Sequence, residues 1–201
     1  MSDKSANLTL RANIIIHGFA AAAAATSALT ATVPFLGPLM GDTIGLTAIT
    51  IAMTMSLASL FDRKFEEGAL WSFAAVILGM IFGTTLLRGF ISLVPGAGSL
   101  ANATITFTLH EGIGWALFLI FERGGDPTKM SRAELKVAIK EGKIKAKQEK
   151  EAYEQALNKL PPEARLEVEQ LQKKMAEKNI SPNEKQAISD RIISIFEQYN
   201  N

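Results

Sequence analysis

Four long apolar segments fill most of the first 121 residues. They cover residues 13–32, 43–61, 69–94 and 99–121. A helix needs roughly 20 mainly apolar residues to cross the hydrocarbon core of a bilayer, and each segment is close to that length. Four such segments in a row are hard to bury in a soluble domain. The pattern therefore predicts an all-α integral membrane protein with four transmembrane helices, in which the Ala- and Thr-rich first pair could alternatively form a shallow or re-entrant hairpin.

The four segments form two similar pairs. VPFLGPLMGDTI (residues 33–44) connects the first pair, and VPGAGSLANATI (residues 94–105) connects the second. A shift of 61 residues, from Val33 to Val94, aligns Val, Pro, Gly, Thr and Ile of the two strings. We expect two repeated helical hairpins at about residues 12–62 and 73–123, with the same orientation in the membrane, as in a parallel repeat.

The two Pro/Gly strings are interpreted as the corners of the hairpins. Proline disfavours helical geometry in the residue before it, so it ends the incoming helix. Glycine takes the tight backbone conformations that a reversal needs. The turn positions are Pro34, Gly37, Pro95 and Gly98. Asp42, after the first turn, is predicted to cap the following helix.

Charge is concentrated after the fourth segment. Residues 12–121 carry eight charged side chains and residues 122–201 carry thirty. The sequence therefore predicts a membrane domain over residues 1–123 and a charged, helical cytoplasmic tail over residues 124–201. Capping boxes at Ser131 and Ser181 begin two of the three tail helices, and Pro162 suits the first turn of the helix between them.

The distribution of Lys and Arg predicts the orientation. These residues collect on the cytoplasmic side of membrane proteins, and neither hairpin corner contains one. The N-terminus, the link DRKFEEG (residues 62–68) and the tail all contain several. We expect a multi-pass membrane protein with both termini in the cytoplasm; the family resemblance described below implies that the membrane is the bacterial inner membrane. Lys4 and Arg11 resemble the start of a signal peptide, but Asp3 and the length of the apolar stretch weaken that interpretation.

A candidate intramembrane polar site lies in the fourth segment. Glu111 falls near the bilayer midplane of the predicted span, where an unpaired carboxylate is costly. It is either a proton- or ion-responsive site, with His110 beside it, or a protonated side chain that hydrogen-bonds across the bundle. Arg88 either reaches Glu111 or extends to the outer membrane surface. His17 is interpreted as a packed or interfacial histidine.

Two further groups concern helix packing and the membrane surface. Gly79 and Gly83 form a G-x-x-x-G pair that permits close helix contact, which allows a homo-oligomer. The predicted membrane-surface basic residues are Lys129, Arg132, Lys136, Lys140, Lys143, Lys145 and Lys147. Anionic lipids attract such residues by about 1 kcal/mol each near the surface. The alternative is a solvated helix with internal ion pairs such as Glu141–Lys145.

No catalytic, phosphate-binding or metal-ligand pattern occurs in the sequence. The chain has no Cys and only two His. Gly96–Gly98 does not follow a predicted strand, as a nucleotide-binding loop would. We therefore expect a protein that is not an enzyme and has no cofactor, metal or nucleic-acid partner.

Both repeat units resemble a known family. VPGAGSLANATITFTLHEGIGWALFLIFERG and VPFLGPLMGDTIGLTAITIAMTMSLASLF are similar to an uncharacterised bacterial membrane-hairpin family that is associated with Era-like and dynamin-like GTPases. The shared features are P-x-x-G turns, a first helix rich in small residues, and an aromatic–acid end, here Phe121-Glu122. The resemblance covers about residues 13–123 and implies helical membrane hairpins. It implies no catalytic residues, and the chain has no GTPase motif of its own.

Three functions remain open from the sequence. The first is a non-enzymatic inner-membrane protein whose hairpins hold the tail at the membrane, where it binds a protein partner or lipid. The second is a small ion- or proton-linked channel or transporter, lined by Glu111, His110 and Arg88. The third is a toxin-immunity-like membrane protein, which only the size and the membrane content favour.

Overall fold

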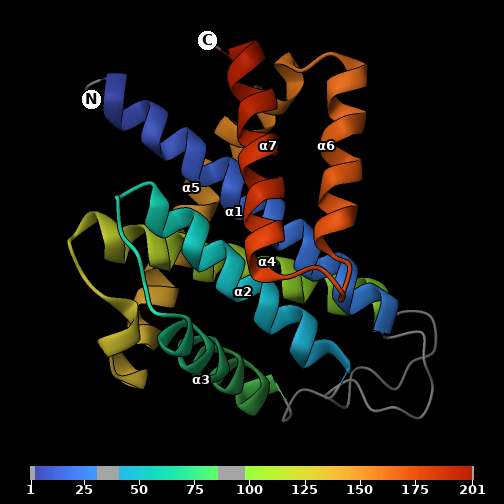
Figure 1. Cartoon of the computed structure of the whole chain (residues 1–201). Helices are drawn as coiled ribbons and strands as arrows, with labels where there is room; N and C mark the ends of the chain where they lie inside the picture. The colour runs from blue at the N-terminus through green and yellow to red at the C-terminus, as the bar shows by residue number, and fades with distance from the viewer. Residues whose placement is uncertain (1–2, 31–40, 86–97, 201) are drawn as a thin grey trace.

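The computed structural model describes residues 3–30, 41–85 and 98–200, and within these residues the chain is entirely helical (Figure 1). The elements are α1 (Asp3–Thr30), α2 (Gly41–Ser59), α3 (Glu67–Thr85), α4 (Gly98–Glu122), the short 3-10 helix η3 (Pro127–Lys129), α5 (Arg132–Lys159), α6 (Pro162–Met175) and α7 (Pro182–Asn200). The all-α prediction is confirmed for these residues.

Two of these helices are long and apolar enough to cross a membrane. The candidate spans are Ala6–Ala28 in α1 and Ala103–Glu122 in α4, and each is 56% buried inside the structure. Shorter apolar stretches occur in α2 (Ile44–Ser59) and α3 (Glu67–Met80). Length and composition thus give two candidate spans among the described residues, where the sequence predicted four.

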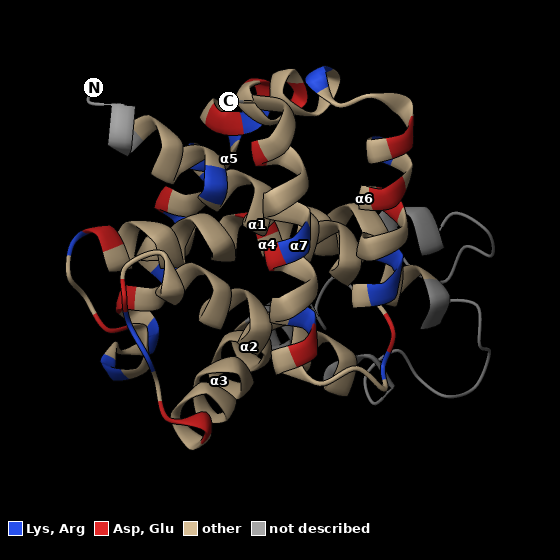
Figure 2. Ribbon diagram, turned by 45° about the horizontal axis from the view of Figure 1, so that its top comes forward, with Lys and Arg blue, Asp and Glu red and all other residues tan. Residues whose placement is uncertain are grey.

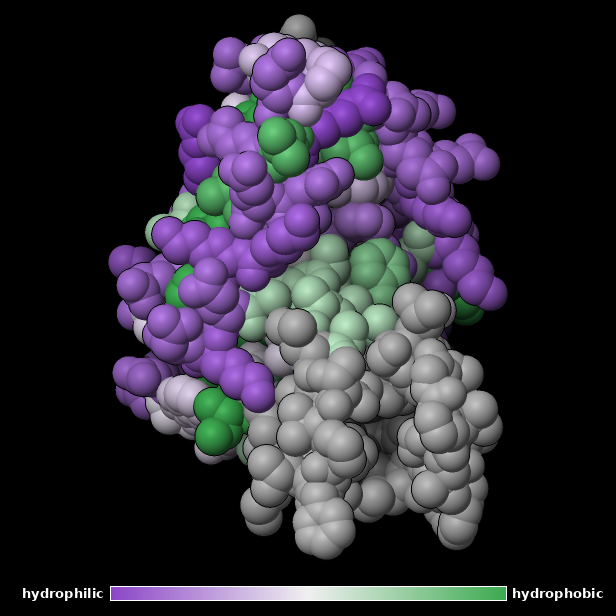
Figure 3. Space-filling view, turned by 90° about the vertical axis from the view of Figure 1, so that its right-hand side faces the viewer, coloured by the Kyte–Doolittle hydropathy of each residue, from purple (hydrophilic) through white to green (hydrophobic). Residues whose placement is uncertain are grey.

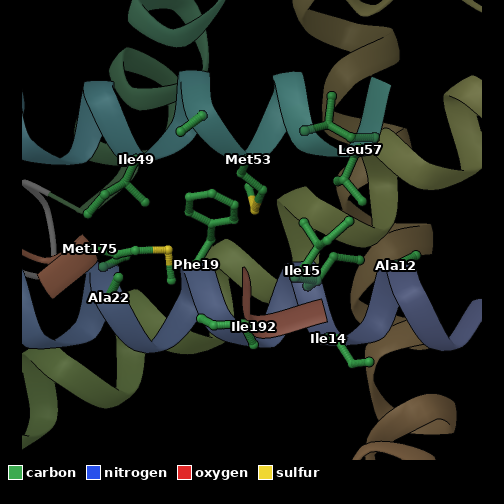
Figure 4. Close-up of a cluster of buried hydrophobic side chains, with 14 of the residues drawn as sticks. Ala12, Ile14, Ile15, Phe19, Ala22, Ile49, Met53, Leu57, Met175 and Ile192 are labelled. Atoms are coloured by element: carbon green, nitrogen blue, oxygen red, sulfur yellow. The ribbon is translucent and has the colours of Figure 1, made fainter. Parts of the chain in front are cut away.

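The centre of the core lies between α1 and α2. Phe19 of α1 is fully buried and points toward Ile49 and Met53 of α2 (Figure 4). Met175 of α6 and Ile192 of α7 belong to the same cluster. Burying one large apolar side chain contributes roughly 1.5–3 kcal/mol. Helices from both the apolar and the charged part of the sequence therefore build one core.

The charged helices pack directly on the apolar ones. α5 lies along α4, while α6 and α7 cover parts of α1 and α2 (Figure 1). α7 turns an apolar face toward the core, because Ile192, Ile195 and Phe196 are all buried. The Lys, Arg, Asp and Glu residues gather on the charged helices and on the connections, and α1 to α4 are almost free of them (Figure 2).

The two predicted hairpins do not pack alike. α1 lies against α2, but α3 contacts α2 and η3 instead of lying along α4. α4 is covered by α1 on one side and by α5 on another. The described parts of the two predicted hairpins therefore pack differently, with α5 beside α4. The duplicated hairpin itself stays a prediction, because both corners lie outside the described residues.

The helix boundaries follow local capping chemistry. Ser131 and Glu134 form the predicted capping box at the start of α5, and the bonds of Ser181 with Glu184 form the second at the start of α7. α1 begins at Asp3, ten residues before the predicted apolar segment. Its early turns stay in contact with the fold, since Arg11 Nε lies 3.1 Å from Glu197 Oε1 of α7.

A buried lysine caps the C-terminal end of α6. Lys185 of α7 has no exposed surface, and its Nζ donates to the backbone oxygens of Met175 and Glu177. The last carbonyl groups of a helix have no partner within the helix and need an external donor. Lys185 supplies that donor at the end of α6, which lies at Met175.

Candidate functional site

A histidine and a glutamate connect the two candidate spans. Nδ1 of His17 in α1 lies 3.2 Å from Oε1 of Glu111 in α4. The two side chains are mostly buried, with 26% and 19% of their surface exposed. Partial burial lowers the effective dielectric constant, which strengthens an interaction between charged groups. The pair is thus a polar contact between two helices that are otherwise apolar.

Aromatic side chains enclose the His17 ring. Tyr153 of α5 stacks on it, with ring centroids 3.7 Å apart and an interplanar angle of 23°. Phe107 of α4 meets it edge-on at 5.0 Å. The Tyr153 side chain also hydrogen-bonds with Gln172 of α6. We call these residues, together with Glu111, the four-helix cluster, because they come from α1, α4, α5 and α6.

The environment of Tyr153 disfavours its ionised form. Burial raises the pKa of Tyr153 to about 12, against an ordinary value near 10. The negative charge of Glu111 acts in the same direction, and the hydrogen bond with Gln172 opposes both. Tyr153 therefore remains a neutral hydrogen-bonding group at physiological pH. The chemistry available to the cluster at that pH resides in the imidazole and the carboxylate.

Glu111 makes its contact across the bundle, with His17 of α1. His110 does not join it, because consecutive residues on a helix point in different directions. His110 is buried, its Nδ1 lies 2.9 Å from the backbone oxygen of Thr106, and its Nε2 has no hydrogen-bond partner. His17, which the sequence assigned only to packing, is the actual partner. Arg88 lies outside the described residues.

The other predicted structural positions are only partly described. Pro34, Gly37 and Pro95 lie outside the described residues, as do the two corners of the hairpins that they were predicted to form. Gly98 is the first residue of α4. α2 begins at Gly41, so Asp42 lies inside its first turn and not before it.

The G-x-x-x-G pair does not contact another helix at its described position. A Cβ added to Gly79 would meet nothing within 4 Å. Gly83 lies in the same helix, and its surroundings are outside the described side chains. Close packing at Gly79 within one chain is therefore absent, and a contact with a second copy stays a prediction.

The basic residues of the tail form an exposed face with one exception. Lys129, Arg132, Lys136, Lys140, Lys143 and Lys147 are exposed. Lys145 is half-buried, pairs with Glu149 at 2.5 Å, and lies 5.6 Å from the ring centre of Trp115 on α4. Glu141 pairs with Arg123 instead. The predicted Glu141–Lys145 pair is therefore wrong, because Glu141 reaches Arg123 after the end of α4, while Lys145 pairs with Glu149 one turn further along its own helix.

A sequence signal for the four-helix cluster existed but was not used. Asn13 and His17 are polar residues four positions apart in an apolar stretch, so they share one helix face. In the structure Asn13 Nδ2 donates to the backbone oxygen of Glu149 in α5, 2.8 Å away. His17 meets Tyr153 one turn further along α5. The two polar positions thus mark the face of α1 that receives α5.

An open cavity among the described residues lies away from this cluster. It has a volume of about 570 Å³, opens to the surface between the end of α2 and the start of α3, and is bounded by Gln186 of α7. Its walls combine apolar residues such as Met55 and Leu70 with the charged residues Asp62 and Lys64. Arg63 also lines it but is held by the backbone oxygen of Gly125.

The described residues define an all-helical protein with two candidate membrane-spanning helices joined by a histidine–glutamate pair. Over the same residues, no three His, Asp or Glu side chains are placed to hold a metal ion. No family model, curated protein or solved structure matches the chain.

Proposed function

We propose that this chain is a non-enzymatic membrane protein whose apolar helices anchor a charged helical module, α5 to α7, that binds a protein partner or lipid. The observation that carries the proposal is the presence of two helices, α1 and α4, that are long and apolar enough to cross a bilayer. The separation of charge along the chain supports it, because the charged residues lie mostly outside the apolar helices (Figure 2).

The surface is also divided into a charged part and an apolar part. On one side of the molecule, hydrophilic residues cover the charged helices and border an apolar area (Figure 3). Exposed large apolar residues include Ile44 of α2, Trp71 of α3 and Ile105 of α4. Single exposed apolar residues are ordinary, but an apolar area rimmed by polar residues is typical of an interaction surface. A lipid bilayer is the partner that suits this chemistry.

The finer topology is also part of the proposal. We propose four spans, with α2 and α3 supplying the other two, and both termini in the cytoplasm of a bacterium. The basic residues exposed on α5 are suited to anionic lipid headgroups. The family resemblance makes a membrane-associated GTPase one candidate partner for the module. The open face of α3 at Gly79 is suited to a second copy of the chain.

Extraction and labelling test this proposal. After expression in bacteria, the full-length protein is expected in the membrane fraction and to resist extraction by alkaline carbonate. Because the native chain has no Cys, single cysteines at Gly37, Gly98 and Lys64 report the topology. A membrane-impermeant maleimide should label the first two in intact cells and the third only after lysis. Release by carbonate would disprove membrane integration, and labelling of Lys64→Cys in intact cells would disprove the topology.

A second function is favoured by the position of the His17–Glu111 pair. Both members lie within the candidate spans, and ionisable groups inside a membrane commonly mark an ion or proton pathway. If the protein is a proton- or ion-linked channel, purified protein in liposomes will show flux that Glu111→Gln abolishes. Wild-type protein without flux, or Glu111→Gln with unchanged flux, would eliminate this function.

A further inference from the structure

We propose that the face of α4 now covered by α5 is a lipid-binding surface, and that α5 must leave it before α4 crosses a bilayer. In the closed form α5 is packed on α4, and in the membrane-inserted form α5 has left α4. This inference rests on the proposed membrane function and adds a regulatory step to it.

The contact between α5 and α4 is close and centred on the candidate span. A Cβ added to Gly142 of α5 would lie 2.1 Å from the backbone oxygen of Gly112 and 2.6 Å from the backbone nitrogen of Ala116. Only glycine fits at such a distance. Gly112 is midway along the span Ala103–Glu122. α5 therefore touches α4 at the depth that would be the middle of the bilayer.

The outer side of α5 carries charge at this same depth. Lys143 runs past Gly112, where its Cγ would lie 2.7 Å from an added Cβ, and its side chain is exposed. Lys140 and Lys147, one turn to either side, are exposed as well. A lysine near a helix end can extend its ammonium group to the membrane surface, but these three lie beside the middle of the span. The docked arrangement would place them in hydrocarbon, which strongly disfavours charged groups.

The inner side of α5 covers apolar residues that suit lipid chains equally well. Ile113, Leu117 and Ile120 of α4 meet Leu135 and Ile139 of α5 around a very small void. Lipid tails are as apolar as these α5 side chains, so both can occupy the same face of α4. In water α5 covers the face, and in a bilayer lipid replaces it.

Polar contacts tie the docked α5 to α1 as well as to the end of α4. Asn13 of α1 donates to the backbone oxygen of Glu149 in α5. Arg123, which follows α4, and Glu141 of α5 are paired at 2.8 Å, but 62% and 41% of their side-chain surfaces are exposed. Exposed ion pairs contribute little to stability. Release of α5 thus breaks this exposed ion pair together with the contacts of α5 to Asn13 and His17 of α1, and transfers the apolar face of α4 from one apolar neighbour to another.

A disulfide lock combined with a lipid-contact probe tests the inference. Ala116 of α4 and Ala138 of α5 line the same small void, so cysteines at both positions can be joined by oxidation or by a short bis-maleimide. Trp71→Phe leaves Trp115 as the single tryptophan, buried in α4 beside Lys145 of α5. Phosphatidylcholine with brominated acyl chains quenches tryptophan on contact. Full-length protein is reconstituted in such vesicles in locked and reduced forms.

The reduced protein is expected to lose most of its Trp115 emission, and the locked protein is expected to keep it. The matched control joins no helices: Ala116→Cys with Ala152→Cys places the second thiol on the exposed side of α5, and its quenching should not depend on oxidation. Equal quenching of locked and reduced protein would overturn the inference, since α4 would then contact lipid with α5 in place. Failure of both forms to float with vesicles would instead overturn the proposed membrane function.

A second variant tests the same step without cysteine chemistry. Gly142→Val in the Trp71→Phe background prevents the close crossing, so it should increase quenching of Trp115 above that of the unlocked parent. Gly79→Val is the control, because a side chain there meets open space. Circular dichroism confirms that each variant retains its helices. A Gly142→Val protein that stays helical and is quenched no more than its parent would also contradict the inference.

Discussion

At the scale of single residues, Lys185 shows how a buried charge can serve a helix end. Its side chain leaves water completely and donates to two backbone oxygens at the C-terminus of α6. Positive charge near a helix C-terminus is also favoured by the helix dipole. The same burial disfavours the charged form and lowers the pKa of Lys185 to about 8. The stability of the fold therefore depends on the protonation state of Lys185.

Replacing Lys185 with Met is expected to destabilise the fold by about 1–3 kcal/mol, because two buried carbonyl groups lose their donor. Urea unfolding in mild detergent, followed by circular dichroism at pH 7, measures the change. Lys173→Met, at an exposed position in the last turn of α6, should change the free energy of unfolding far less. Equal effects of the two substitutions would show that Lys185 does not act as a cap.

The lowered pKa of Lys185 also predicts a pH dependence. Its folded-state pKa of about 8 lies below the unfolded value near 10.4. Between these values the unfolded chain binds more protons than the folded one, so the contribution of this group to stability rises with pH. The difference in unfolding free energy between wild type and Lys185→Met should therefore grow from pH 8 to pH 10. A difference that stays constant or shrinks would contradict the lowered pKa of Lys185 in the folded protein.

The contribution of Tyr153 to stability changes with pH in the opposite direction. Its folded-state pKa of about 12 exceeds the unfolded value near 10, so its contribution to stability is lost as the pH rises above 10. In Tyr199→Phe, absorbance at 295 nm reports the ionisation of Tyr153 alone. We expect little phenolate at pH 10.5 while the helical circular dichroism signal persists. Substantial ionisation there in a folded protein would mean that Tyr153 is not buried on His17.

At the scale of elements, glycines decide which helices can meet closely. Gly142 and Gly112 lie where α5 crosses α4, and each would meet atoms of the other helix if it carried a side chain. Gly79 has the same sequence signature of a packing glycine but faces open space within the chain. A motif of small residues therefore identifies helices that are able to pack, and the tertiary structure determines which of them do.

Gly142→Ala is expected to destabilise the protein by roughly 1–3 kcal/mol or more, because the added methyl group overlaps the α4 backbone and the helices must separate. Gly79→Ala should be neutral or stabilising by up to about 1 kcal/mol, since alanine favours a helix and nothing obstructs it. Thermal unfolding of both variants in the same detergent measures the contrast. A Gly142→Ala protein as stable as wild type would contradict the close crossing.

The sequence predicted the elements better than their partners. The capping boxes at Ser131 and Ser181 were found because the side chain and the backbone that it caps are three residues apart. The packing of α5 on α4 was not predicted, because it depends on a glycine in the charged segment that only the folded helix places against Gly112. For the same reason the sequence could name only the neighbour His110 beside Glu111 and no residue across the bundle, because the partner His17 lies 94 residues away.

At the scale of the whole molecule, the charged and apolar segments share one core. Phe19 of α1 lies among residues from α2, α6 and α7. A tail that was only tethered to a membrane domain would not contribute side chains to this cluster. The described helices should therefore lose their structure together when the core is damaged, and not as a membrane part followed by a tail.

Phe19→Ala tests this coupling. Removing a fully buried phenylalanine typically costs about 3–5 kcal/mol, and we expect faster amide hydrogen exchange in α6 and α7 as well as in α1 and α2. Hydrogen exchange read by mass spectrometry resolves the four helices. Ile144→Ala, at a position that is 60% exposed on α5, should leave exchange nearly unchanged. Unaltered protection of α6 and α7 in Phe19→Ala would show that they form a separate unit.

The bond between Arg63 and Gly125 has a consequence for how the protein could enter a bilayer. It ties the link after α2 to the turn after α4, so these charged connections lie at one end of the bundle. Ser27 bonds to Thr106 near the opposite end, where α1 finishes and α4 starts. Residues 31–40 and 86–97, which follow α1 and precede α4 in the chain, contain one charged side chain, Arg88. The link between α6 and α7, with Glu177 and Lys178, lies at this same end, because Thr26 Oγ1 donates to the backbone oxygen of Ala176 and the Lys178 side chain lies beside Gly45. Entry led by this end would therefore carry these charges into hydrocarbon unless α6 and α7 first left α1 and α2.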